Sequence, residues 1–229
     1  MSDFEFSNDI VDNGQPLLPL CLCLDTSGSM RGQPIAELNR GIELFYDNVR
    51  KDEVACAAAD VCIVTFGEGG ARCQYDFASL FNRPTPPTLK AGGNTPMGDA
   101  VNLALDLLEK RRNEYRAKGV EHYKPWLVLM TDGHPYGDSS KNAVSTAQKR
   151  ASDMVSKRDL VVFPIWVGHD NTANGMDTLA GFSPQNRPRQ LKGVDFASFF
   201  GWLSKSVSAT SHSSSESDIK LPPLEWSVV

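Results

Sequence analysis

The sequence lacks the features of a membrane or exported protein. Its 229 residues contain no apolar run approaching the roughly 20 residues of a membrane-spanning helix, and the longest runs, such as residues 160–167, are strand-sized. The N-terminus, MSDFEFSNDI, is acidic and polar, whereas a signal peptide needs a basic start followed by an apolar segment. We therefore expect neither a membrane partner nor secretion.

Cysteine is scarce, and its spacing excludes the common zinc and redox motifs. There are five cysteines, an odd number, and none are spaced as C-x-x-C. Cys21 and Cys23 stand two apart in one apolar segment, so they share a face, and Cys62 lies in another apolar run. This pattern favours buried, reduced thiols over a metal or redox site, and it fits a cytoplasmic location.

Several catalytic motifs are also missing. The chain has no G-x-x-x-x-G-K-[ST] phosphate loop, no G-x-G-x-x-G after the first expected strand, no H-E-x-x-H and no G-x-S-x-G. The formal net charge of -5 disfavours nucleic acid and anionic membranes as partners, because both would be repelled at long range. These absences favour a non-enzymatic protein.

Apolar runs of strand length alternate with segments of helical period, which predicts an α/β fold with a mostly parallel sheet. The run at residues 17–24 has no solvent face, as expected for a strand covered by helices on both sides. The linker at residues 67–70 is too short for a parallel crossover, so residues 72–77 should return as an antiparallel edge strand. The remaining elements are expected in this order: helix 34–50, strand 61–66, helices 97–118 and 140–157 flanking strand 125–130, strand 160–167, helix 176–180, a weak strand near 190 and helix 196–206.

The domain organisation follows from the same reading. An N-terminal segment, residues 1–15, precedes one domain at residues 16–208. Residues 209–229 are predicted to form a Ser-rich flexible tail, because few apolar side chains are present to offset the entropy of ordering it. Its last residues, LPPLEWSVV, are apolar enough to dock on this domain or on a partner.

Oxygen-bearing side chains gather where expected strands end and helices begin. The segment DTSGS leaves the first strand, Thr95 precedes the helix that starts at Met97, and Asp132 follows the strand WLVLM in the sequence TDG. Ligands of an open parallel sheet bind at the carboxyl ends of its strands, so these oxygens should converge. Carboxylates and hydroxyls without histidine or cysteine suit a hard cation: magnesium, with manganese or calcium as substitutes.

The segments DTSGS, NTPMGDA and LMTDG together resemble the metal-ion-dependent adhesion site of von Willebrand factor A domains. The resemblance implies five metal ligands, Asp25, Ser27, Ser29, Thr95 and Asp132. It also implies a three-layer, doubly wound, Rossmann-like fold with one short antiparallel edge strand. Within the family the hydroxyls bind the metal directly, the aspartates often act through water, and an open coordination position attracts a partner's acidic side chain. The implied function is divalent-metal-dependent protein–protein interaction.

A closer likeness concerns a bacterial subgroup. The segments VVFPIWVGHD, Phe182-Ser183-Pro184 and LKGVDFASFFGWLSKSVSATS resemble proteins found with tellurium-resistance genes. That resemblance implies a scaffold or regulator in tellurite or stress resistance or in phosphorylation signalling. The partner would then be a PP2C-type phosphatase or a Ser/Thr kinase.

Alternatives remain open at this point. Asp25 could instead serve a magnesium-dependent phosphatase or phosphotransferase, although the acid that such enzymes carry two residues later is Ser27 here. His134 and His169 fall in loops near the expected site, where they could contact a partner or stay solvated. Glu216 or Glu225 of a neighbouring copy could supply the acid that completes the metal shell.

Overall fold

The computed structural model describes residues 15–83, 85–168, 173–191, 193–213, 219–225 and 227–228. Within these residues one twisted sheet has the strand order β3-β2-β1-β4-β5-β6-β7. Its strands are β1 (Leu18–Thr26), β2 (Ala59–Gly67), β3 (Gly70–Ser79), β4 (Trp126–Thr131), β5 (Val161–Trp166), β6 (Arg189–Leu191) and β7 (Ser227–Val228). The helices are the 3-10 turn η1 (Gly28–Met30), α1 (Gln33–Arg50), α2 (Glu53–Ala58), α3 (Met97–Lys118), α4 (Ala143–Ser156), α5 (Ala173–Ala180) and α6 (Phe196–Ser211).

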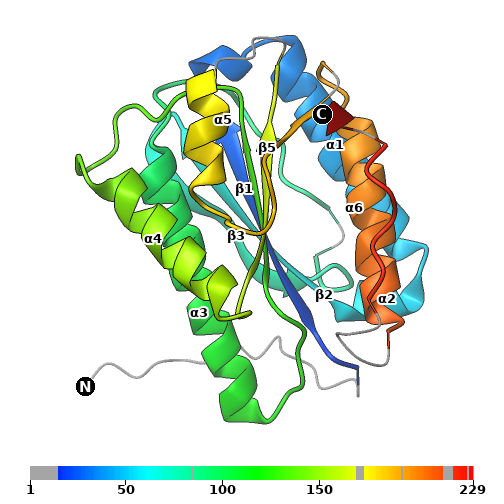
Figure 1. The fold of residues 1–229 in the computed structure, drawn as a ribbon. Coiled ribbons are helices and arrows are strands. Elements are labelled where there is room, and N and C mark those ends of the chain that lie inside the picture. Colours follow the sequence, from blue (N-terminus) through cyan, green and yellow to red (C-terminus); the bar gives the residue numbers. More distant parts are fainter. Residues whose placement is uncertain are drawn as a thin grey trace.

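The helices form two layers around the sheet (Figure 1). Helices α1, α2 and α6 cover one face, and α3, α4 and α5 cover the other. Strand β1 is buried along its whole length, with Leu20, Leu22 and Leu24 packed toward α1 and α6 and Cys21 and Cys23 toward α3. The expected α/β fold with three layers is therefore confirmed.

The two edges of the sheet differ from its parallel centre. Strands β2, β1, β4, β5 and β6 run parallel, whereas β3 pairs antiparallel with β2, as the short linker predicted. At the other edge, β7 pairs antiparallel with β6. One antiparallel edge strand is predicted from the sequence; this second strand has only two residues and is defined by its long-range pairing alone, so no local pattern indicates it.

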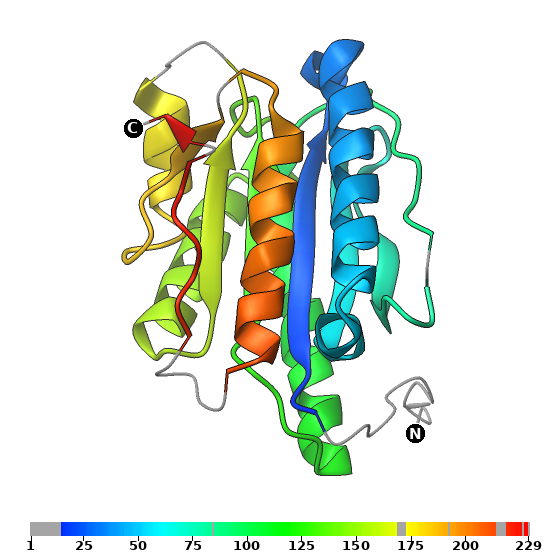
Figure 2. The ribbon, with the colours of Figure 1, turned by 90° about the vertical axis from the view of Figure 1, so that its right-hand side faces the viewer.

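The C-terminal part of the chain lies against its own domain. Helix α6 continues to Ser211, five residues beyond the end expected at Ser206, so the predicted boundary between residues 208 and 209 falls inside this helix. Ser206 and Thr210 are fully buried and donate their hydroxyls to main-chain carbonyls one turn earlier. Residues 219–225 then run beside β5 and α6 (Figure 2), where the Trp202 indole donates to the Pro222 carbonyl oxygen at 2.9 Å.

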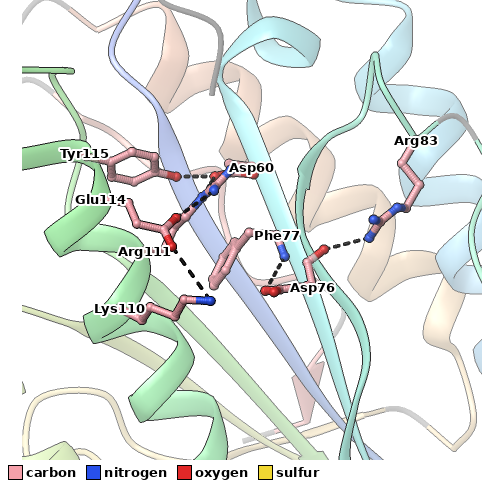
Figure 3. A network of polar contacts seen from close by, with 8 residues as sticks. All are labelled: Asp60, Asp76, Phe77, Arg83, Lys110, Arg111, Glu114 and Tyr115. Atoms are coloured by element: carbon pink, nitrogen blue, oxygen red, sulfur yellow. Dashed lines mark hydrogen bonds and ion pairs between the residues drawn. The ribbon is translucent and has the colours of Figure 1, made fainter. Parts of the chain in front are cut away.

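A buried ionic network lies near the amino-terminal end of β2 (Figure 3). Arg111 on α3 donates from Nε to Asp60 Oδ2 at 2.6 Å and from Nη1 to Glu114 Oε2 at 2.9 Å. The Tyr115 hydroxyl also donates to Asp60. Both carboxylates face the Arg111 guanidinium, and the Lys110 ammonium lies 3.8 Å from Glu114, so the network joins α3 to the sheet with two cations for its two carboxylates.

Among the described residues, no helix combines the length and the apolar character needed to cross a bilayer.

Candidate functional site

The first part of the site is the carboxyl end of β1, where the sheet passes into a tight turn. Asp25 is 1% exposed, and its Oδ1 accepts the Ser27 main-chain N–H at 2.8 Å. This bond folds the backbone back over the carboxylate, as aspartates do in turns. Ser27 is buried and Ser29, one residue into the 3-10 turn, is exposed, with their hydroxyl oxygens 3.0 Å apart.

The second part comes from β4, the parallel neighbour of β1. Its last residue, Thr131, is fully buried and donates its hydroxyl to Asp25 Oδ2 at 2.5 Å. The next residue, Asp132, accepts the Ser29 hydroxyl on Oδ1 at 2.6 Å. Hydrogen bonds, made directly or through Thr131, therefore connect four residues across two strand ends: Asp25, Ser27, Ser29 and Asp132.

The third part is the loop before α3, which carries Thr95. This loop docks on the end of β1 through two main-chain bonds, from Gly92 N to the Thr26 carbonyl at 2.8 Å and from Gly28 N to the Gly93 carbonyl at 3.0 Å. Gly93 has a φ of +73°, and a Cβ there would lie 2.7 Å from the Glu68 backbone. Only glycine satisfies both constraints, so the sequence GGN can bring Thr95 close to the β1 turn.

Gly133 shows how close the third part comes to the first. A Cβ built on Gly133 would lie 3.7 Å from Thr95 Oγ1 and 3.9 Å from Ser29 Oγ. The hydroxyl oxygens of Thr95 and Ser29 therefore both lie close to Gly133, the residue after Asp132. The five residues named from the sequence all lie at one edge of the sheet, four of them linked by hydrogen bonds and Thr95 beside them.

Two loops of the site are fastened together. Thr95 and Tyr136 exchange main-chain hydrogen bonds at 3.0 and 2.9 Å. Asp99, in the first turn of α3, accepts the Ser139 main-chain N–H at 2.6 Å and the Ser139 hydroxyl at 2.7 Å. Gly98 lets α3 and α4 cross closely, because a Cβ there would lie 2.4 Å from the Val144 nitrogen. The loop after Asp132 and the start of α3 are thus held as one unit.

The electrostatics of the site are dominated by carboxylates. Burial raises the pKa of Asp25 to about 6, although the hydrogen bonds from Thr131 and Ser27 act in the opposite direction. Burial also raises the pKa of Asp132, against the hydrogen bond from Ser29. Within the described part of the chain, no ion pair involves either aspartate. Burying a carboxylate without a cation is costly, so a positive charge brought here would be stabilised.

The donor set fits a hard dication. It consists of carboxylate and hydroxyl oxygens, which magnesium, manganese and calcium prefer, with no thiol or imidazole among the five residues. Thr131, which orients Asp25, was not anticipated from the sequence. Thr131 directly precedes Asp132 in LMTDG, and a buried hydroxyl at the last position of a strand was the available signal.

The rim of the site carries two exposed rings. Tyr136 is 70% exposed, and His134 is exposed with its ring centroid 6.2 Å from that of Trp166. His169 and Glu216, which the sequence analysis also named, lie outside the described residues. Glu225 is exposed on the C-terminal segment.

The family model of the von Willebrand factor type A domain matches residues 20–192, more than half of the chain. No curated protein matches the sequence. Many solved structures share the fold.

Two solved structures illustrate the structural similarity. The vWF domain of the type V pili tip protein Mfa5 from Porphyromonas gingivalis aligns with a TM-score of 0.65 at 10% identity, covering 88% of this chain and 98% of that one. The pilus adhesin SpaC from Lactobacillus rhamnosus GG aligns with a TM-score of 0.62 at 13% identity. The alignment covers 85% of this chain but only 30% of SpaC, so the present chain corresponds to a small part of that adhesin. At such identities the likeness establishes the fold.

Proposed function

Because the chain belongs to the von Willebrand factor type A domain family, we propose that it is a divalent-metal-dependent protein-interaction module. One observation carries this proposal: buried Asp25, which forms no ion pair among the described residues, is linked to Ser27, Ser29 and Asp132 at the sheet edge where ligands of this fold bind. The pilus adhesin and pilus tip protein with the same fold support a role in adhesion-type contacts.

In this proposal a magnesium ion, which manganese or calcium can replace, is held by five residues: Asp25, Ser27, Ser29, Thr95 and Asp132. A bound dication would supply positive charge with an open coordination position, which attracts a carboxylate of the partner protein. The protein's own residues do the positioning. Thr131 and the Ser27 main chain fix the two oxygens of Asp25, while Ser29 fixes Asp132.

The cellular role that we propose follows the closer resemblance of the C-terminal half. The module would act as a scaffold or regulator in a bacterial tellurite or stress-resistance pathway or in phosphorylation signalling, in the cytoplasm. Its partner would be a PP2C-type phosphatase or a Ser/Thr kinase that offers an acidic side chain. Neither nucleic acid nor a membrane is proposed as a partner.

The alternative, a phosphatase or phosphotransferase that uses Asp25 as a nucleophile, has less support. Such an enzyme needs a second acid to protonate the leaving group, and the residue two positions after Asp25 is Ser27. The hydrogen bonds from the Ser27 N–H and the Thr131 hydroxyl fix the orientation of the Asp25 carboxylate. Turnover of a generic phosphoester with magnesium, abolished by Asp25→Asn, would favour the enzyme instead.

The test of the proposed function is magnesium binding by titration calorimetry on the full chain. Asp132→Ala should abolish measurable binding, and Ser27→Ala should weaken it less, because that variant keeps both carboxylates. Asp153→Ala, which removes an exposed aspartate near the end of α4, is the matched control and should bind as the parent does. Equal affinity in Asp132→Ala and the parent would refute the assignment.

Partner binding provides the second readout. Proteins retained from the native cell in magnesium should elute with chelator, and Asp132→Ala should retain none of them. Far-ultraviolet circular dichroism must show the same fold for every variant. Retention that does not respond to chelator would contradict a metal-dependent interface even if magnesium binds.

A further inference from the structure

A second group of metal-binding side chains lies away from the site described above, where β2 pairs with β3. One ligand atom from each of Cys62, Cys73 and Asp76 lies within 4.8 Å of the other two. Cys62 belongs to β2, while Cys73 and Asp76 belong to the antiparallel edge strand β3. The sequence offered no sign of this group, because its cysteines are not spaced as C-x-x-C. That spacing favoured unrelated, buried thiols.

An irregular register brings these side chains together. In a regular strand Cys73 and Asp76, three residues apart, would point to opposite faces of the sheet. The pairing between β2 and β3 shifts twice, between Val61 and Ile63 and again between Ile63 and Val64. Each shift adds a residue on β3 and alters the alternation, as a β-bulge does. Bulges often re-aim a side chain, and here they place a thiol and a carboxylate beside Cys62.

A third thiol extends the group into the interior. Cys21 is the register partner of Cys62 on β1, and the Cys62 thiol lies near enough to the thiols of Cys21 and Cys73 to interact with both. Cys21 and Cys62 are fully buried, whereas Cys73 is exposed. The three sulfur atoms therefore lie in a row from the buried β1 to the exposed edge strand β3. A solute can reach the group at Cys73 and Asp76.

We propose that Cys62, Cys73 and Asp76 bind a thiophilic d10 cation, with Zn²⁺ as the representative ion and water as the fourth ligand. Sulfur ligands with one carboxylate suit zinc in four-coordinate geometry and do not suit magnesium. Two thiolates and one carboxylate exceed the charge of a dication by one. Arg83 lies next to the group and donates to the Asp76 main-chain oxygen at 2.6 Å (Figure 3), so its guanidinium can offset that excess.

This centre is chemically distinct from the oxygen site at the end of β1, and neither proposal depends on the other. Its position also differs, since it ties the edge strand β3 to its neighbour β2. Bound metal would thus fasten an antiparallel edge strand, whereas the oxygen site faces a partner.

Cobalt is the probe that separates the two sites, since thiolate ligands give Co²⁺ an intense near-ultraviolet charge-transfer absorption that oxygen ligands lack. The full chain, kept reduced with a phosphine, should develop this absorption with one equivalent of Co²⁺, and Zn²⁺ should abolish it. Cys73→Ser should lose the absorption, and Asp76→Asn should weaken Co²⁺ binding while keeping the sulfur signal. Cys56→Ser, which changes a buried cysteine on α2, is the matched control and should retain the signal.

Two further results would overturn the proposal. One is the absence of the sulfur absorption when Co²⁺ is added to the reduced parent protein. This result would overturn the proposal even if the cysteines form a disulfide on oxidation. The other is an absorption that survives in Cys73→Ser with the fold intact by circular dichroism. Asp132→Ala should keep the signal in full, so failure of the oxygen site and failure of the sulfur site are read separately.

Discussion

Two buried aspartates on neighbouring strands, Asp25 and Asp60, have opposite surroundings. Asp25 lies at the carboxyl end of β1 and Asp60 near the amino end of β2; they are 1% and 2% exposed, and each accepts a hydroxyl hydrogen bond. Only Asp60 has a cation built into the fold, the Arg111 guanidinium at 2.6 Å. Asp60 therefore belongs to a structural ion pair, whereas Asp25 has no such partner among the described residues, and an uncompensated buried charge is costly.

The same contrast appears in proton affinity. Burial alone would lower the pKa of Arg111, but the adjacent Asp60 raises it above its ordinary value, so the guanidinium keeps its charge. Burial raises the pKa of Asp25 to about 6. The Arg111 guanidinium therefore stays charged throughout the physiological range, whereas the Asp25 carboxyl holds its proton more readily than an exposed aspartate does.

The largest loss of stability is expected when Asp60 is deprived of its cation, Arg111. Arg111→Met keeps most of the side-chain volume but leaves two buried carboxylates without their cation, so it should lower the free energy of unfolding by about 3–5 kcal/mol. Urea denaturation measures this. Lys110→Ala is the control, because its ammonium is 53% exposed and 3.8 Å from Glu114, and the loss should be about 0.5 kcal/mol or less. Equal losses in the two variants would show that the network does not stabilise the fold.

The next effect concerns Asp25 and pH. In the metal-free protein the folded state binds a proton at Asp25 up to about pH 6, whereas an exposed aspartate loses it near 3.8. The folded state therefore holds more protons in this window, and the free energy of unfolding should fall as pH rises through it, by at most about 3 kcal/mol.

Asp25→Asn tests that window, because the amide cannot ionise. Urea unfolding in chelator, measured between about pH 4 and pH 7, should show the parent losing stability relative to Asp25→Asn as pH rises. Magnesium added at neutral pH should restore stability to the parent alone, since only its carboxylate attracts the ion. Parallel pH curves for the two proteins would rule out a raised pKa for Asp25.

The smallest loss of stability is expected when the Thr131 hydroxyl, which donates to Asp25, is removed. Thr131→Val removes the hydrogen bond to Oδ2, which should cost about 1–2 kcal/mol of stability and weaken magnesium binding less than Asp25→Asn does. Thr26→Val is the matched control, because the Thr26 hydroxyl is also buried but donates to the Phe66 carbonyl. It should cost similar stability and leave magnesium affinity unchanged. Weakened binding in Thr26→Val alone would reverse the assignment.

Much of the fold was predictable because long periodic segments carry strong signals. The helix expected at residues 97–118 has those bounds, ended by Gly119 in the left-handed conformation. Helix α2 was missed, since six residues are too few for a helical period; it depends on Asp52 accepting the main-chain N–H groups of Val54 and Ala55. The end of α6 was missed because its serines resemble a linker in composition yet are buried against neighbouring helices.

The site was predictable to the extent that strand ends reveal it. Five oxygen-bearing residues were named from three short segments, and the structure gathers them at one edge of the sheet. The buried ionic network was not anticipated, because Asp60 and Arg111 are 51 residues apart. Arg111 does continue the inward spacing of Leu105 and Leu108 along α3, so a charge at an inward position was the available signal. The sulfur group depends on two register shifts that no local pattern reveals.

The fastening between the loop after Asp132 and the start of α3 has a consequence for anyone wishing to transplant the oxygen site. Thr95 and Asp132 are far apart in the chain, yet Asp99, Ser139 and the Gly98 crossing make their supports one mechanical part. Grafting the ligand-bearing peptides alone onto another scaffold would deliver the right atoms in uncorrelated positions. The smallest portable unit includes the first turns of both helices.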